Sequence, residues 1–113
     1  MNNPTLGIIG GGQLGSLLGM AAKKVSIKTI VLSDDINAPA RNFSNEFIYG
    51  KYDDLKKINE FLKKVDLVTY EFENIPYNIL NKINQSKKVL PKPKINKLIQ
   101  NRLTEKDFVN KLN

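Results

Sequence analysis

Apolar and polar residues are arranged along the chain in blocks that predict strands and helices in turn. A short apolar run at residues 6–9 ends in three glycines and is followed by leucines and alanines at helical spacing up to Val25. A buried strand, a tight turn and an amphipathic helix in this order form the first half of a βαβ unit. The N-terminal pattern therefore predicts the beginning of a parallel sheet.

The rest of the chain repeats this alternation at short intervals. β-Branched and apolar runs predict further strands at residues 26–32, 47–50, 66–70 and 87–90. Apolar residues spaced by three and four predict helices over residues 55–65 and from Pro76 onwards, with Asn74 as the N-cap of the second. The chain is predicted to be an α/β domain with a Rossmann-like open parallel sheet and helices on both faces.

The C-terminal segment has a different pattern. It predicts two short amphipathic helices, with Thr104 as the N-cap between them. We expect residues 1–90 to form the Rossmann-like domain and residues 91–113 to form a helical linker that leads to an absent domain. Apolar side chains on these linker helices are expected to lie exposed and to favour self-association: Leu98, Ile99, Phe108 and Leu112.

Composition removes several classes of chemistry. The 113 residues are enough for one domain and contain neither cysteine nor histidine, which excludes disulfides, thiolate nucleophiles, histidine acid–base catalysis and ordinary zinc sites. The formal charge of +7 comes from lysines scattered over all polar faces, so we expect no nucleic-acid partner. No apolar run is long enough to cross a bilayer, and we expect a cytoplasmic protein without a membrane partner.

The glycines after the first strand have the spacing G-x-G-x-x-G, at Gly10, Gly12 and Gly15. One glycine permits the sharp turn, one lets the backbone approach a phosphate, and one lets the helix pack closely on the strand. The N–H groups that begin the following helix favour an anion. Asp34 lies about 20 residues further on, where dinucleotide-binding folds place the acid that holds a ribose. The alternatives are a purely structural turn and a polar loop residue.

A second polar group follows the strand predicted at residues 66–70. Alternation along the extended chain places Glu71 and Glu73 on one side of it. Ligands of open α/β sheets bind at the carboxyl ends of the strands, where the glycine turn and Gln13 are also expected. An amide, an anion-binding turn and two acids would then converge on one small molecule. The alternative is that the glutamates cap the next helix or face solvent.

Four segments together resemble the PurK family, the 5-(carboxyamino)imidazole ribonucleotide synthases of the ATP-grasp superfamily. The segments are G-G-G-Q-L-G at residues 10–15, A-P-A at 38–40, T-Y-E-F-E-N-I-P at 69–76 and Q-N-R-L-T-E-K at 100–106. The resemblance covers nearly the whole chain and is to the N-terminal, pre-ATP-grasp domain of that family. Family members commonly have other residues where this chain has Ser16, Leu17, Ser33 and Asn101.

The resemblance implies an ATP- and magnesium-dependent ligase step in purine biosynthesis. In the family, ATP phosphorylates bicarbonate to carboxyphosphate, and the exocyclic amine of aminoimidazole ribonucleotide takes up the carboxyl group. The N-terminal domain supplies part of the ribonucleotide site and binds no NAD, while ATP and magnesium are held mainly by other domains of a homodimeric enzyme.

Site residues are implied by the same resemblance. The residues implied to contact the ribonucleotide are Gly12, Gln13, Leu14, Glu71 and Glu73. Arg102 is implied to contact ATP, and no catalytic residue or metal ligand is expected in this chain, which should be inactive by itself. Two other interpretations stay open: the NAD(P)-binding Rossmann domain of an oxidoreductase, and a stand-alone nucleotide-binding module.

Overall fold

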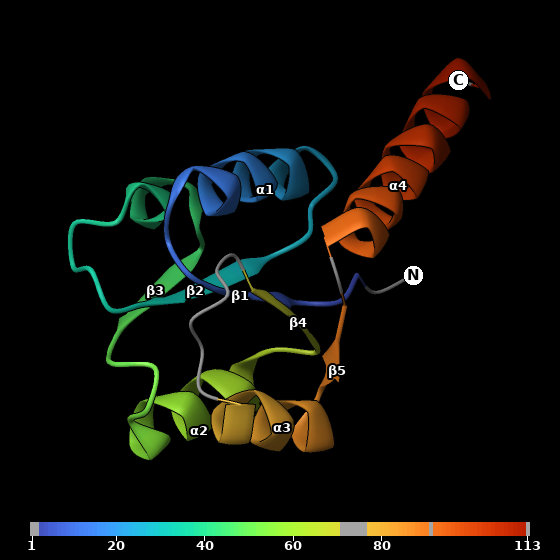
Figure 1. The fold of residues 1–113 in the computed structure, drawn as a ribbon. Helices are drawn as coiled ribbons and strands as arrows, with labels where there is room; N and C mark the ends of the chain where they lie inside the picture. Colours follow the sequence, from blue (N-terminus) through green and yellow to red (C-terminus); the bar gives the residue numbers. More distant parts are fainter. Residues whose placement is uncertain (1–2, 71–76, 91, 113) are drawn as a thin grey trace.

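The chain forms a five-stranded parallel sheet between two layers of helices (Figure 1). The structure is a computed structural model that describes residues 3–70, 77–90 and 92–112. The strands lie in the order β3-β2-β1-β4-β5, and every pairing between neighbours is parallel. Their bounds are β1 (Leu6–Ile9), β2 (Thr29–Ser33), β3 (Glu46–Tyr49), β4 (Leu67–Tyr70) and β5 (Lys88–Val89).

Helices cover both faces of the sheet, as the sequence pattern predicts. Figure 1 shows α1 (Gln13–Lys24), the 3-10 helix η1 (Pro39–Phe43) and α4 (Lys92–Leu112) on one side of the sheet. The opposite side carries α2 (Leu55–Lys64) and α3 (Tyr77–Ser86). The prediction of a Rossmann-like α/β domain is therefore confirmed.

Central strand β1 is apolar on both faces because each face has its own hydrophobic core. Ile8 packs with α1 and α4, whereas its neighbour Ile9 packs with α2 and α3. Since successive side chains of a strand point to opposite faces, a continuous apolar run is needed wherever helices cover both sides. The core on the α1 face contains Leu6, Ile8, Leu18, Ala22, Val25, Ile27, Val31, Ala40, Ile95 and Ile99. The core on the α2 face contains Ile9, Ile30, Leu32, Ile48, Ile58, Phe61, Leu62, Val65, Val68, Ile79 and Ile83.

The second strand begins three residues later than its apolar pattern predicts. Helix α1 ends at Lys24. The N–H of its C-cap residue Val25 donates to Ala22 O at 3.1 Å, and Ser26 takes a left-handed φ of 60°. The chain needs residues 26–28 to turn from the helix back into the sheet. β2 therefore pairs with β1 only from Thr29.

The C-terminal segment is one continuous helix, so the prediction of two short helices with Thr104 as N-cap is wrong. Thr104 Oγ1 donates instead to the carbonyl of Gln100, one turn earlier in the same helix, at 3.0 Å. No glycine or proline lies between residues 94 and 112 to interrupt α4. The first half of α4 also packs on the sheet: Ile95 is fully buried and Ile99 is 7% exposed, which contradicts the expected exposure of Ile99. The side chains of Phe108 and Leu112 lie outside those described.

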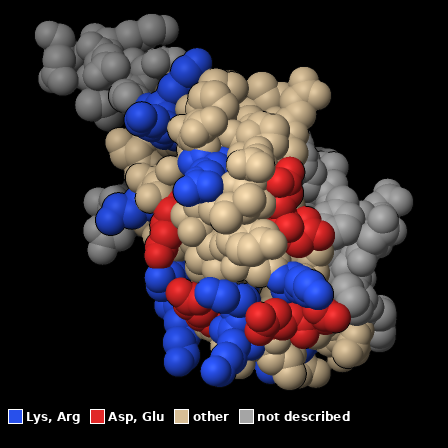
Figure 2. Space-filling view, turned by 90° about the vertical axis from the view of Figure 1, so that its left-hand side faces the viewer, with Lys and Arg blue, Asp and Glu red and all other residues tan. Residues whose placement is uncertain are grey.

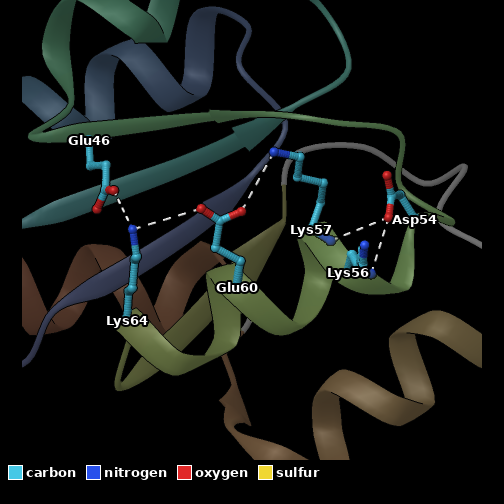
Figure 3. Close-up of polar contacts among 6 residues, drawn as sticks. All are labelled: Glu46, Asp54, Lys56, Lys57, Glu60 and Lys64. Carbon is cyan, nitrogen blue, oxygen red and sulfur yellow. Dashed lines mark hydrogen bonds and ion pairs between the residues drawn. The ribbon is translucent and has the colours of Figure 1, made fainter.

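The start of α2 and the outer edge of the sheet carry paired charges (Figure 3). Asp54 caps α2, because its Oδ1 accepts the N–H groups of Lys56 at 3.1 Å and Lys57 at 3.4 Å. At the other end of α2, Lys64 donates to Glu46 of β3, and this hydrogen bond raises the pKa of Lys64. Positive and negative side chains are interleaved on this face (Figure 2). The pairs are exposed, so they contribute little to stability.

Candidate functional site

The glycine turn lies where β1 ends and α1 begins. Gly10 has φ 110°, a left-handed conformation that glycine adopts at little cost, and its N–H donates to Leu32 O at 2.8 Å. Gly12 is the N-cap of α1, and its carbonyl accepts both the N–H and the hydroxyl of Ser16 at 3.1 Å. The turn thus brings the N-terminus of α1 to the carboxyl edge of the sheet.

The N-terminus of α1 is electrostatically suited to an anion. The N-cap residue Gly12 carries no side chain, and no acid lies in the first turn of this helix, whereas Lys23 and Lys24 lie in its last turn. The helix dipole contributes positive potential at the turn, which is opposed by the negative charges of Asp34 and Asp35 nearby. The side chain of Gln13, the first helical residue, is exposed to solvent, while the side chain of Leu14 lies outside those described.

A pocket of about 340 Å³ opens beside this turn, at the carboxyl ends of β1 and β2. It is lined by Gly10, Gly11, Gly12, Ser33, Asp34, Asp35, Ala38, Pro39 and Tyr52. Asp34 and the glycine turn therefore share one pocket, the arrangement that their sequence spacing predicts. Neither Gln13 nor Arg102 is among the described residues that line it.

Tyr52 is a pocket residue that the sequence pattern did not predict. Burial raises the pKa of its phenol, and the charge of Asp34 raises it further. Two hydrogen bonds, one with the Ser33 side chain and one with the Asp34 backbone, lower the pKa in part. Its position in the sequence could have indicated this role, because Tyr52 comes after the third strand and so lies at the same edge of the sheet as the glycine turn. Burial thus favours the protonated phenol, which contributes a hydrogen-bonding group to the lining of the pocket.

The loop between β2 and η1 is ordered by its own polar groups. Ser33 Oγ accepts the N–H of Asp35 at 3.1 Å, and Asp35 Oδ1 accepts the N–H of Asn37 at 2.9 Å. The N–H of Ala38 donates to Asp35 O at 3.0 Å, and the N–H of Ala40 reaches across to Gly11 O at 2.9 Å. This loop is therefore fixed to the glycine turn.

The two predicted glutamates, Glu71 and Glu73, lie outside the described residues, as do Asn74 and Pro76. The strand that leads to them is described. β4 pairs directly with β1, with Tyr70 opposite Ile9, so the chain leaves β4 beside the strand that enters the glycine turn. Arg102 lies on α4, where its Nη1 is 3.3 Å from Glu105 Oε2.

No metal site or membrane segment was found in the described part of the molecule. Among residues 3–70, 77–90 and 92–112, no three carboxylate, histidine or cysteine side chains are grouped so that they could hold a metal ion. Over the same residues, none of the helices combines the length and the apolar character that crossing a membrane requires.

The chain is similar in sequence and in fold to known N5-carboxyaminoimidazole ribonucleotide synthases. N5-carboxyaminoimidazole ribonucleotide synthase of Brucella melitensis is 43% identical over 106 residues, which cover 94% of this chain and 29% of that protein. The crystal structure of the Staphylococcus aureus synthetase complexed with ADP superposes with a TM-score of 0.73 at 42% identity, covering 76% of this chain and 23% of that one. The Aspergillus clavatus synthase, in complex with ADP and 5-aminoimidazole ribonucleotide, superposes with a TM-score of 0.69 at 28% identity, covering 93% and 30%.

The family assignment rests on these matches. The chain spans less than a third of the length of these relatives. A family model described as the ribonucleotide synthetase preATP-grasp domain matches residues 3–100. The parallel sheet, the glycine turn and the pocket beside it all lie within that match. The chain belongs to the ribonucleotide synthetase preATP-grasp domain family.

Proposed function

We propose that this chain supplies part of the ribonucleotide site of an ATP-dependent N5-carboxyaminoimidazole ribonucleotide synthase. Such an enzyme joins bicarbonate to the exocyclic amine of aminoimidazole ribonucleotide and releases ADP and phosphate. The observation that carries the proposal is the glycine turn, which presents the N-terminus of α1 at the carboxyl edge of the sheet, in a chain 43% identical to the Brucella melitensis synthase.

Contacts to the ribonucleotide are assigned to the two segments that leave β1 and β4. Gly12, Gln13 and Leu14 begin α1, where backbone N–H groups suit an anionic or polar part of the ligand. Glu71 and Glu73 come after β4, and a carboxylate is the acceptor that an amine or a ribose hydroxyl requires. The parallel pairing of β1 with β4 supports this joint role, because both strands end at the same edge of the sheet.

ATP and magnesium are assigned to the remainder of the enzyme, with one contribution from this chain. Arg102 would contact ATP, because a guanidinium pairs well with phosphate oxygens. When bound, the metal would supply charge neutralisation at the phosphates. We place its ligands, the bicarbonate site and the homodimer contacts outside the residues described.

The role of the site is to orient and to exclude water. The amine of an aminoimidazole is a weak nucleophile, so holding it against a short-lived carboxyl donor is mainly a proximity effect. Residues around the glycine turn fix the ribonucleotide, and the acids hold its polar groups. In this proposal none of them transfers the carboxyl group.

A chimera tests the proposal directly. The segment of the Brucella melitensis synthase that matches this chain is exchanged for residues 1–113, and ADP release is measured with and without aminoimidazole ribonucleotide and bicarbonate. We expect turnover only when both are present. Glu71→Gln should raise KM for the ribonucleotide more than KM for ATP, Arg102→Ala should do the opposite, and Asp53→Asn at the start of α2 is the matched control.

Two results would contradict the proposal. One is a folded chimera without ribonucleotide-dependent turnover, while the parent enzyme is active in the same assay. The other is tight binding of NADH to the 113-residue chain that Asp34→Ala abolishes. That outcome would instead support a dinucleotide-binding domain, the alternative favoured by the presence of Asp34 in the same pocket as the glycine turn.

A further inference from the structure

The glycine turn and α1 are fitted against residues 38–43 at two points. A Cβ atom at Gly11 would lie 2.4 Å from Ala38 Cβ and 3.0 Å from Ser33 Oγ. A Cβ atom at Gly19, two turns further along α1, would lie 2.5 Å from the carbonyl oxygen of Phe43. Neither separation leaves space for a methyl group, so the two glycines permit an approach that no other residue allows.

This contact is made by a rigid segment. Ala38 is 3% exposed and Ala40 is fully buried, and the N–H of Ala40 donates to Gly11 O at 2.9 Å. Arg41 anchors the segment further, because its Nη1 donates to Ile36 O at 2.9 Å and its guanidinium lies 5.5 Å from the centre of the Phe47 ring on β3. The segment is thus held by the sheet on one side and holds Gly11 on the other.

The contact bears on the candidate ligand site because Gly11 directly precedes the N-cap of α1. That N-cap is Gly12, so the direction of the first N–H groups of the helix depends on the backbone of the turn. An anion at a helix N-terminus is held by those N–H groups, and a small rotation of the turn misdirects them. On the side that faces residues 38–43, the backbone of Gly11 already contacts the protein itself: it packs against Ala38, and its carbonyl accepts the N–H of Ala40.

We infer that residues 38–43 are a positioning element for the ribonucleotide site, in which Ala38 acts through Gly11 to set the orientation of the α1 N-terminus. The inference rests on the proposed function. Ala38 itself is a positioning residue that need not touch the ligand. The fit is one of size: the missing side chain of Gly11 and the methyl group of Ala38 complement each other.

A size-exchange experiment tests this fit. Binding of aminoimidazole ribonucleotide to the 113-residue chain is followed by amide chemical shifts in NMR spectra of wild type, Gly11→Ala, Ala38→Gly and the double variant. We expect Gly11→Ala to weaken binding by about tenfold, which corresponds to a misdirected helix N-terminus. The double variant should recover part of this loss, since Ala38→Gly removes the methyl group that collides with the new one, whereas Ser33 Oγ stays 3.0 Å from it.

Gly7→Ala is the matched control. A Cβ atom at Gly7 also collides with its neighbours, at 2.5 Å from Phe61 Cζ, but in the core on the α2 face of the sheet. It should lower the melting temperature and leave the dissociation constant within about twofold of wild type, measured where all variants are folded. If Gly11→Ala does not fold, the comparison of Ala38→Gly with wild type carries the test, with weaker binding expected.

Distinct outcomes identify which statement fails. Wild-type binding together with an unchanged dissociation constant in Gly11→Ala would overturn the positioning role, and so would equal losses in Gly11→Ala and Gly7→Ala. A double variant no better than Gly11→Ala would overturn the size-exchange argument. Absence of ribonucleotide binding to folded wild-type chain would overturn the proposed function, and this inference with it.

Discussion

The ring of Phe61 on α2 lies directly against Gly7 on β1, so closely that a Cβ atom at Gly7 would stand 2.5 Å from Phe61 Cζ and 2.9 Å from Val65 Cγ1. Phe61 is fully buried in the core on the α2 face of the sheet. The glycine in the central strand therefore permits close packing of the helix on the sheet.

Gly7→Ala should lower the free energy of unfolding by about 1–3 kcal/mol, because the added methyl group overpacks a filled core. Urea unfolding monitored by circular dichroism measures this change. The double variant Gly7→Ala/Phe61→Leu should lose less than the sum of the two single variants, since the shorter side chain makes room. Strict additivity would contradict the packing explanation.

Asp54→Ala should destabilise the chain by about 1 kcal/mol, because it removes the side-chain cap from two backbone N–H groups at the start of α2. Its neighbour Asp53 is also exposed, and Asp53→Ala provides a control that changes the charge equally. Chemical denaturation of both variants decides the case. Equal losses would mean that charge, and not the cap, explains the effect.

Thr29→Val should raise the free energy of unfolding by about 1 kcal/mol. Thr29 is 1% exposed, and its hydroxyl finds no hydrogen-bond partner in the described part of the chain, although its N–H is bound by Asn45 Oδ1 at 2.9 Å. Valine keeps the shape and removes the buried polar atom. Thr29→Ser, which keeps the hydroxyl and loses the methyl group, should destabilise. A loss of stability in Thr29→Val would reveal a partner for the hydroxyl.

The raised pKa of Tyr52 predicts a loss of stability at alkaline pH. Burial raises the pKa of its phenol above the ordinary value of about 10, so folding favours the protonated form. The stability of the fold is therefore fully kept below pH 10, where Tyr52 is protonated, and falls as the pH rises through the raised pKa. Thermal melts of wild type and Tyr52→Phe should therefore keep a constant difference in melting temperature below pH 10, and wild type should lose stability relative to Tyr52→Phe as the pH rises above 10. Tyr49→Phe, at a residue 52% exposed on β3, should follow the wild-type curve.

Local sequence patterns predicted the layers of this fold because each layer depends on local periodicity. The apolar run of β1, between two cores, and the helical spacing in α2 are read directly from neighbouring residues. α4 was divided wrongly because Thr104 is a good N-cap in isolation, while its actual hydrogen bond lies within the helix. An N-cap residue predicts a helix start only where the preceding helix also has a reason to end.

The candidate site was predictable only in part. The spacing of Gly10, Gly12 and Asp34 indicated a pocket that the structure also forms. Contacts between distant segments gave no such signal: Gly11 against Ala38 and Tyr52 beside Ser33 depend on how loops meet in three dimensions. The roles of Gln13, Glu71, Glu73 and Arg102 stay predictions, to be decided by kinetic measurements on the chimera.

The placement of β1 between β2 and β4 has a consequence for how the molecule assembles. Of these two neighbours, β4 is distant from β1 in sequence. Just before the two strands, the N–H of Thr5 donates to Asp66 Oδ2 at 2.7 Å across a separation of 61 residues. Closing so long a loop carries an entropic cost before any contact rewards it. During synthesis on the ribosome, the first strand emerges long before this partner, and its apolar edge stays unpaired until Leu67–Tyr70 has been made. During that interval the nascent chain can aggregate through this unpaired strand edge.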